Sequence, residues 1–274
     1  MTTIVIWDVK ESFHPDIPPG AILAISDSRT STGAGVLTDN CSKIFEVYAR
    51  CEIRNNWQIE LSGPTENKSI TVAIAGSTLV AHNVVFCLQQ GLYRLVGAAM
   101  PTMMEIAEFA ASVASRLTKE IGFQMAQRAL SEVVLIGHDE DGIIKTISIK
   151  PSVNAANLYN IIEIKDYPYT FGSGSEKFSK EYSARSLETA DESIRGQLPL
   201  MIFDELFLLG GGDKDTGGDL QMVATTLDGL TRFSPMRWNA SKEAYSLTFY
   251  GEEISKKKIG NAHIAHHPWQ LNDI

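Results

Sequence analysis

Three residues near the N-terminus have types that together could support nucleophilic catalysis. Thr2 follows Met1 directly, Asp27 ends an apolar run, and Lys43 follows Asp27 after sixteen residues. A threonine hydroxyl is a weak nucleophile and needs a base, which an N-terminal residue supplies through its own α-amino group, of pKa about 7.7 to 8.0. A nearby Lys43 ammonium would lower the pKa of both groups, and Asp27 would hold that ammonium in place. This chemistry requires the removal of Met1, which we expect because Thr2 is a small residue.

Each of these residues also has a purely structural interpretation when it is taken alone. Thr2 can be the frayed start of a strand, Asp27 and Arg29 can be turn residues, and Lys43 can be a solvated strand residue. The catalytic hypothesis therefore depends on the combination.

The hydrophobic pattern predicts the strands and helices that must position these residues. A proline-rich connector over 14–20 joins the first two predicted strands, and 55–69 is predicted as a long hairpin tip. The break from Gly97 to Pro101 separates the first two predicted helices. The predicted strands are 2–7, 21–27, 43–49, 70–75, 132–137, 143–149, 159–165, 219–226, 231–236 and 244–250, and the predicted helices are 77–97, 103–128, 175–190 and 194–208.

The order of these elements indicates the fold class. Strands and pairs of helices follow one another without a regular βαβ alternation, which favours antiparallel sheets covered by helices. We therefore predict an α+β fold, a four-layer αββα sandwich with two antiparallel sheets inside. No linker rich in Pro, Gly or Ser separates two cores, so we expect one domain over 1–250 and a polar tail over 251–274.

Composition excludes several classes of function. The chain has 274 residues, of which 44% are hydrophobic, and a net charge of −9. A nucleic-acid or anionic-membrane surface would show a basic stripe, and none is visible. No window approaches the roughly 18 apolar residues of a membrane span. Cys41, Cys51 and Cys87 are three widely spaced cysteines in apolar runs, which is typical of a reducing compartment, so we expect a cytoplasmic protein.

Several further segments carry a resemblance to a known family. They occur in order along the chain as Thr2-Thr3-Ile4-Val5, Ala24-Ile25-Ser26-Asp27-Ser28-Arg29, Lys43, Ala73-Ile74-Ala75-Gly76-Ser77, Phe171-Gly172-Ser173-Gly174-Ser175 and Asp213-Lys214-Asp215-Thr216-Gly217-Gly218. Their order and spacing resemble the proteasome β-subunit family and the related bacterial heat-shock-locus peptidase. Both are N-terminal nucleophile hydrolases. The longer first hairpin and the tail after residue 250 depart from the family pattern, and the acidic residue usual after the Ala-Gly-Thr turn is absent.

The resemblance implies roles for further residues. Ser173 and Asp213 would complete the hydrogen-bond network around the Thr2 amine, with Thr216 supporting it. The backbone N–H of Gly76 would donate to the oxyanion. Five uncharged positions would bind substrate, with a preference for a neutral, apolar residue before the cleaved bond: Thr30, Ser31, Cys41, Ile74 and Thr78.

The activity implied by the resemblance is that of a threonine endopeptidase. The family builds rings that compartmentalise proteolysis, so the resemblance implies a homo-oligomer of ring or related form, a peptide or protein substrate and an ATP-dependent unfoldase as a possible partner. Two alternatives remain open. One is an N-terminal nucleophile amidohydrolase that acts on a small amide, and the other is a non-catalytic shell subunit.

Other polar patterns give weaker indications. The glycine-rich segment from Gly210 to Lys214 lacks the Gly-Lys-Ser/Thr ending of a phosphate-binding loop. Asp213, Asp215 and Asp219 form only part of a calcium-loop pattern, so an EF-hand is excluded and a loosely bound cation is a minor alternative. Histidines near the C-terminus are interpreted as part of the polar tail: His263, His266 and His267. We expect no metal centre and no cofactor.

Overall fold

The computed structural model of the chain divides into two compact units. The first contains Met1–Ile44, Pro168–Ala224 and Thr231–Ile274, and the second contains Phe45–Tyr167 and Thr225–Leu230. The structure describes all residues except 1, 13–16, 33–34, 55–63, 126–128, 140, 153–157, 190, 210–215, 235, 240–243, 250–251, 254–257, 260–261, 264–266 and 269–274. The assignment of 1–250 to one domain stays a prediction.

The first unit is built on a six-stranded sheet with the order β11-β1-β2-β12-β13-β19. Strand β1 pairs antiparallel with both β2 and β11, so the N-terminal strand lies inside the sheet. Nearly every side chain of β1 and β2 is buried, which explains their almost continuous apolar sequence. The strands are β1 (Thr3–Asp8), β2 (Ile22–Ser26), β11 (Tyr169–Gly172), β12 (Gln221–Thr226), β13 (Gly229–Ser234) and β19 (His267–Pro268).

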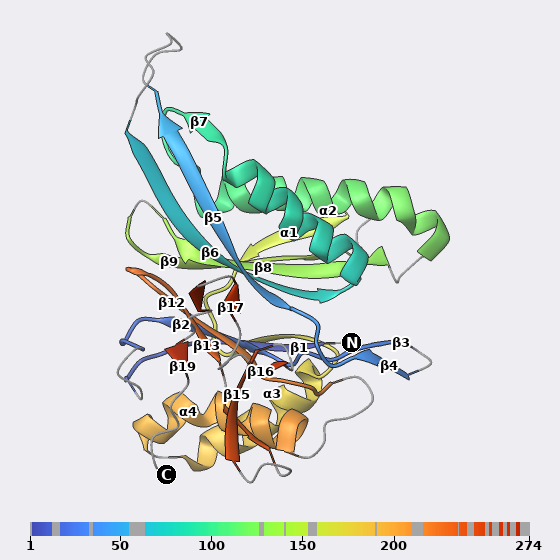
Figure 1. Ribbon diagram of the computed structural model, residues 1–274, viewed down its shortest axis with the longest axis vertical. Helices are drawn as coiled ribbons and strands as arrows, with labels where there is room; N and C mark the ends of the chain where they lie inside the picture. The colour runs from blue at the N-terminus through green and yellow to red at the C-terminus, as the bar shows by residue number, and fades with distance from the viewer. Residues whose placement is uncertain are drawn as a thin grey trace. The chain divides into compact units, whose positions relative to one another are not determined.

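Two helices and a π-helical segment also belong to this unit (Figure 1). Helix α3 (Ser175–Glu188) follows β11 and contacts β1, and α4 (Glu192–Phe203) continues as a π-helical segment, η2 (Asp204–Leu209). Pro199 lies inside α4 and removes one backbone donor from the helical ladder. The indole N–H of Trp7 donates to Gly196 O at 3.0 Å, which ties β1 to α4.

The second unit contains another six-stranded sheet, with the order β10-β9-β8-β6-β5-β7. The pairs β6–β8, β8–β9 and β9–β10 are antiparallel, and the edge pair β5–β7 is parallel. The strands are β5 (Ile44–Ile53), β6 (Thr65–Gly76), β7 (Leu95–Gly97), β8 (Ser131–His138), β9 (Ile144–Pro151) and β10 (Tyr159–Glu163).

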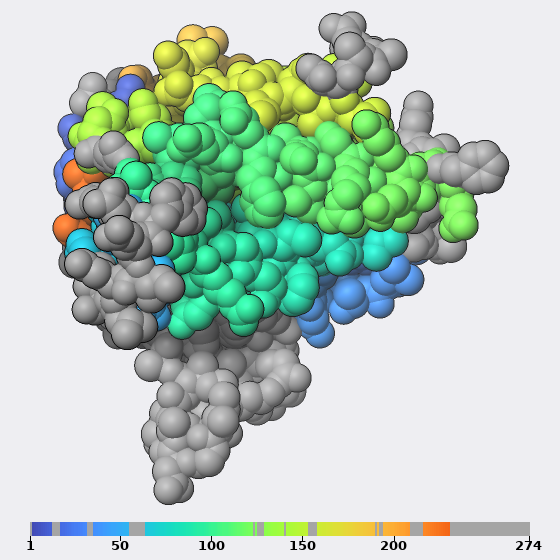
Figure 2. All heavy atoms as spheres, turned by 90° about the horizontal axis from the view of Figure 1, so that it is seen from above, coloured from blue at the N-terminus to red at the C-terminus, as the bar shows by residue number. Residues whose placement is uncertain are grey.

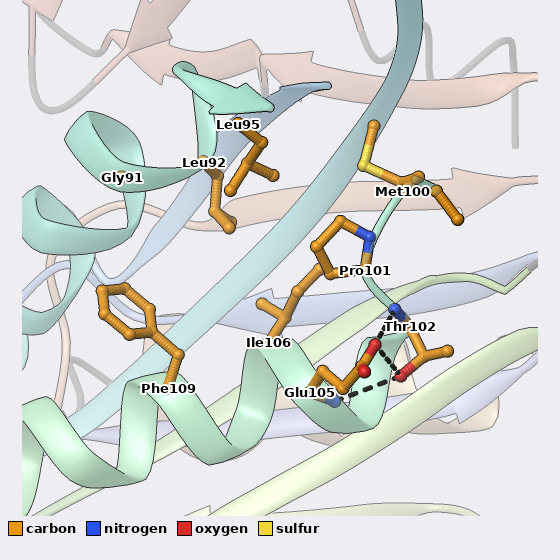
Figure 3. Close-up of a pocket in the computed structure, with 10 residues that line it drawn as sticks. Gly91, Leu92, Leu95, Met100, Pro101, Thr102, Glu105, Ile106 and Phe109 are labelled. Carbon is orange, nitrogen blue, oxygen red and sulfur yellow. Dashed lines mark hydrogen bonds between the residues drawn. The ribbon is translucent and has the colours of Figure 1, made fainter. Parts of the chain in front are cut away.

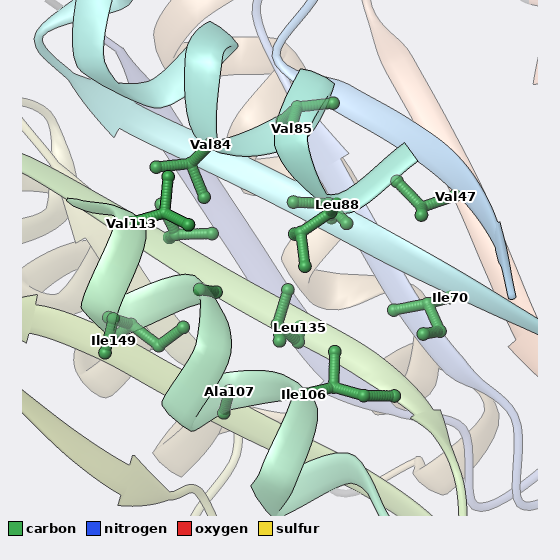
Figure 4. Close-up of a cluster of buried hydrophobic side chains, with 14 of the residues drawn as sticks. Val47, Ile70, Val84, Val85, Leu88, Ile106, Ala107, Val113, Leu135 and Ile149 are labelled. Atoms are coloured by element: carbon green, nitrogen blue, oxygen red, sulfur yellow. The ribbon is translucent and has the colours of Figure 1, made fainter. Parts of the chain in front are cut away.

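Helices α1 (Thr78–Leu92) and α2 (Met103–Met125) cover one face of this second sheet (Figure 1). Alternate residues of the strands and one stripe of each helix form a continuous hydrophobic core, part of which is shown in Figure 4. Val47 and Ile70 come from the sheet, and Leu88 and Ile106 come from the helices. The opposite sides of α1 and α2 lie next to each other on the face shown in Figure 2.

Local signals in the sequence explain where these helices begin. Ser77 caps α1, and its side chain accepts from the N–H of Val80. At α2, Thr102 Oγ1 accepts from Glu105 N at 3.2 Å, and Glu105 Oε2 accepts from Thr102 N at 2.8 Å. This reciprocal pair is a capping box.

The prediction of a helix over 77–97 is wrong at its C-terminal end. Helix α1 ends at Leu92, and Leu95–Gly97 forms strand β7, which pairs with Cys51, Glu52 and Ile53 of β5. Pairing with a neighbouring strand thus overrides the local helical pattern. The hairpin tip over 55–69 is also too long, because β6 begins at Thr65, while residues 55–63 lie outside the described part.

Short strands that the hydrophobic pattern did not indicate complete the described part of the chain. They are β3 (Thr30–Thr32), β4 (Gly35–Thr38), β14 (Met236–Asn239), β16 (Glu252–Glu253), β17 (Lys258–Ile259) and β18 (Ala262–His263), with the predicted β15 (Ala244–Phe249) among them. The mixed α+β class is confirmed. Within the described residues, we find no helix with the length and apolar character needed to cross a bilayer.

Candidate active site

Thr2 lies directly before strand β1, beside the turn that joins β11 to α3. Its backbone N–H donates to Ser173 Oγ at 3.2 Å, and its carbonyl oxygen accepts from Ser173 N at 2.7 Å. The residue is mostly buried. The structure therefore brings Thr2 and Ser173 together across 171 residues of chain.

Gly172 permits this close approach. Its φ of +90° lies in the region that favours glycine, and a Cβ at this position would lie 1.9 Å from the Thr2 carbonyl oxygen. The Gly-Ser-Gly-Ser segment thus has a steric role, because it lets β11 turn into α3 directly against the N-terminal residue.

Asp27 and Lys43 form a buried ion pair. Lys43 Nζ lies 2.9 Å from Asp27 Oδ2, and their side chains are exposed by 3% and 0%. The other carboxylate oxygen, Asp27 Oδ1, accepts from Thr3 N at 2.9 Å. Asp27 therefore links Lys43 to the residue that follows Thr2.

Burial governs the protonation of this pair. Burial raises the pKa of the Asp27 carboxyl, and the Lys43 ammonium and the backbone N–H of Thr3 oppose this effect. Burial also lowers the pKa of the Lys43 ammonium, against the attraction of Asp27. Lys43 is consequently closer to losing its proton than a solvated lysine is.

The turn that contains Thr216 supports the same carboxylate. Gly217 N donates to Asp27 Oδ2 at 3.2 Å, and Gly217 O accepts from Ser28 N and Arg29 N. Arg29 reaches Thr216 O through Nη1 at 3.3 Å and Asp39 Oδ1 through Nε at 2.7 Å. The described residues therefore place Thr216 near the Asp27 end of the site through its backbone.

The remaining predicted site residues fall into three groups. Thr30, Ser31 and Cys41 belong to the first unit, on β3 and on the loop that leads to Lys43. In the second unit, Gly76 ends β6, Thr78 is exposed at the start of α1, and Ile74 packs into the hydrophobic core. Asp213 lies outside the described residues, as does Met1.

Sequence reasoning missed two residues that hold the site together. The sequence indicates Gly217 only as part of a turn. The hydrogen bond from its N–H to Asp27 depends on the folded structure. Gln221 is buried at the start of β12 and bonds to the backbone around Lys43. A glutamine at the start of an apolar strand was the available signal, because a buried amide requires partners.

A pocket of about 680 Å³ lies elsewhere, in the second unit, between the end of α1, β7 and the start of α2 (Figure 3). Leu92, Ile106 and Phe109 contribute apolar walls, while Thr102 and Glu105 are occupied with the capping box. None of the predicted site residues lines it. Among the described residues, no group of three His, Cys, Asp or Glu side chains is placed to hold a metal ion.

Comparison with solved structures identifies the fold. A Gly-1 mutant of Anbu from Hyphomicrobium sp. strain MC1 aligns over 85% of this chain and 87% of its own, with a TM-score of 0.55 and 16% identity. Anbu (ancestral beta-subunit) from Yersinia bercovieri aligns over 84% and 86%, with a TM-score of 0.55 and 15% identity. The chain has the Anbu fold. Anbu is a proteasome-like N-terminal nucleophile hydrolase family, so the resemblance found in the sequence is confirmed at the level of fold.

A third solved structure, a helical assembly of the Anbu complex from Pseudomonas aeruginosa, aligns over 81% of this chain and 80% of its own, with a TM-score of 0.51 and 18% identity. No family model matches the sequence. No curated protein matches it either. The likeness is therefore one of three-dimensional structure at low sequence identity.

Proposed function

We propose that this protein is a threonine peptidase that uses Thr2 as its nucleophile after removal of Met1. The observation that carries the proposal is the buried Lys43–Asp27 pair, whose carboxylate also accepts from the N–H of the residue next to Thr2. A buried ion pair is costly unless it is well bonded, and this one lies beside the predicted nucleophile. The Anbu fold supports the proposal.

The reaction proceeds in two steps. The Thr2 α-amine takes the hydroxyl proton as Oγ1 attacks the scissile carbonyl, and the amine then gives a proton to the departing amino group of the substrate. Water hydrolyses the Thr2 ester and restores the hydroxyl. Ser173 accepts from the Thr2 nitrogen and orients it. The positive charge of Lys43 favours the deprotonated forms of the amine and the hydroxyl.

Several parts of this proposal rest on the family resemblance. They are the role of Gly76 as oxyanion donor, the role of Asp213 and the substrate positions around Thr30 and Cys41. The four-layer αββα arrangement rests on the order of the elements, and the cytoplasmic location rests on the cysteine pattern. Self-assembly is also part of the proposal, and the helical assembly of the Anbu complex from Pseudomonas aeruginosa supports it. An ATP-dependent unfoldase remains the proposed partner.

The deciding experiment is intact mass spectrometry after reaction with a peptide epoxyketone or β-lactone. The expected result is a mature mass that lacks Met1 and a single adduct that maps to Thr2. Retained Met1 would block the catalytic amine and would favour a non-catalytic shell subunit. A free Thr2 that turns over a small amide but no peptide would favour the amidohydrolase.

A further inference from the structure

Gln221 makes three hydrogen bonds to the backbone of the segment Cys41–Ile44, which contains Lys43. Its side-chain oxygen Oε1 accepts from Lys43 N at 2.9 Å and from Ile44 N at 3.2 Å. Its side-chain nitrogen Nε2 donates to Cys41 O at 2.6 Å. One side chain thus binds backbone groups on three of four consecutive residues.

The chemistry of these partners requires an amide side chain. The two N–H groups need an acceptor and the carbonyl of Cys41 needs a donor, so the orientation of the Gln221 amide is fixed by its surroundings. Lys43 lies just before β5, and Gln221 is 5% exposed. The amide therefore supplies a hydrogen-bond partner to the backbone N–H of Lys43, as a neighbouring strand would do inside a sheet.

The same short stretch of chain also contacts the partner of Lys43. Gly217, four residues before Gln221, donates its N–H to Asp27 Oδ2, the oxygen that receives Lys43 Nζ. Residues 217–221 therefore hold both ends of the ion pair, one through a backbone N–H and the other through a side-chain amide.

We propose that Gln221 is a positioning residue, which fixes the backbone of Lys43 so that its ammonium meets Asp27 beside Thr2. This inference deepens the proposed function and rests on it for its effect on catalysis. Gln221 thus affects catalysis only through the position of Lys43. We expect Gln221→Met, which keeps the length of the side chain but loses all three bonds, to lower kcat about 10²-fold with little change in KM.

The pKa of Lys43 distinguishes a positioning role of Gln221 from a general contribution of Gln221 to the stability of the protein. The charged or ionisable groups that act on Lys43 are Asp27, Cys41 and Arg29. Release of the Cys41–Ile44 backbone hydrates the ammonium, so its pKa should rise toward the ordinary value of about 10.4. NMR of protein with ¹³Cε-labelled lysine measures this pKa directly, in the full chain and without substrate.

A matched control removes a buried hydrogen bond in the second unit. Tyr159 OH bonds to Thr118 Oγ1 at 2.9 Å in the second unit, so Tyr159→Phe tests loss of a buried hydrogen bond remote in sequence from Lys43. We expect it to lower the melting temperature and to leave the titration of Lys43 unchanged. Where the methionine variant is unstable, Gln221→Thr provides a residue of high strand propensity at the same position.

The outcomes are distinct. A raised pKa of Lys43 in the Gln221 variants, with the control unchanged, supports the proposal. An unchanged titration of Lys43 overturns it, whatever the activity. Wild-type protein that neither cleaves peptides nor reacts with the inhibitors contradicts the proposed function, while the NMR titration still decides whether Gln221 positions Lys43.

Discussion

Asp27 joins several parts of the candidate site. Its two carboxylate oxygens accept from the Lys43 ammonium and from the backbone N–H groups of Thr3, Arg29 and Gly217. A carboxylate with this many donors is held in a single position. It therefore couples the charge beside the predicted nucleophile to the strand from which that nucleophile projects.

Replacement of Thr2 by alanine tests the nucleophile. We expect Thr2→Ala to lower peptide hydrolysis by roughly 10⁶-fold and to abolish adduct formation, because the attacking oxygen is lost. The hydrogen bonds from Thr2 to Ser173 that involve the backbone remain, so the fold should be retained. Turnover of fluorogenic peptides and circular dichroism measure the two effects.

Thr2→Ser serves as the control for that variant, since it keeps a hydroxyl on the same backbone. It should retain part of the activity and react with the β-lactone. Full activity in Thr2→Ala would remove Thr2 from the mechanism.

Loss of the Lys43 charge should change both activity and its pH dependence. The Thr2 amine acts as a base only when it is neutral, so activity rises as the pH passes the pKa of that amine. A nearby ammonium lowers this pKa, and Lys43→Ala therefore shifts the rise in activity to higher pH. We expect kcat to fall about 10²- to 10⁴-fold. A rate–pH series on both proteins is the measurement.

The stability of the same variant needs a separate control. Lys43→Ala leaves Asp27 buried without its cation and should cost about 3–5 kcal/mol of folding free energy. The double variant Asp27→Asn with Lys43→Ala removes both charges and should recover part of that stability without recovering activity. An unshifted and undiminished pH profile in Lys43→Ala would show that Lys43 is a structural residue only. Lys43→Arg should rescue activity only in part, because the guanidinium is larger than the ammonium.

At the scale of the elements, the turn from β11 into α3 gives a sharp steric prediction. Gly172→Ala should destabilise the protein strongly and abolish activity, because the new Cβ overlaps the Thr2 carbonyl oxygen. Gly142 is the matched control: its φ of +73° is also positive, but nothing lies within 4 Å of the added carbon. We expect Gly142→Ala to cost only about 1–2 kcal/mol. Urea denaturation of both variants provides the comparison, and equal costs would contradict the steric argument.

The sequence was sufficient to predict the long strands and helices but not the short strands at the sheet edges. The predicted strand 2–7 and helix 103–128 correspond to β1 and α2. Strand β1 is a short apolar run rich in β-branched residues, and α2 has a helical hydrophobic period and a capping box. Strand β7 was missed because its three residues become a strand only through parallel pairing with β5. Such short edge elements depend on partners distant in sequence, which local patterns do not contain.

In the candidate site, too, local patterns are visible in the sequence, whereas contacts between distant residues are not. The types and spacing of Thr2, Asp27 and Lys43 predict a catalytic role, which stays a prediction, and the structure pairs Asp27 with Lys43. A glutamine at the start of an apolar strand signals that its amide needs partners, but the sequence does not identify them, because they lie about 180 residues earlier in the chain. Hydrogen bonds to backbone groups leave no signature in the sequence of the segment that receives them.

At the scale of the whole molecule, the outer faces of α1 and α2 carry apolar side chains beyond those in the core. Phe86 on α1 is 57% exposed and Phe109 on α2 is 42% exposed, and the two helices lie next to each other on one face (Figure 2). Exposed apolar side chains that gather over neighbouring elements are typical of association sites. A monomer would leave this surface in water.

We therefore predict a homo-oligomer whose contacts include the face formed by α1 and α2. Wild-type protein at micromolar concentration should scatter light as a species well above the 30.1 kDa of one chain. The double variant Phe86→Glu with Phe109→Glu should dissociate, because it places charges in an apolar contact that must lose its water. Leu187, which is 89% exposed on α3, supplies the control, and Leu187→Glu should leave the assembly intact. A wild-type monomer would contradict self-assembly and favour the small-amide enzyme, whereas dissociation by Leu187→Glu alone would place the contact on the other pair of helices.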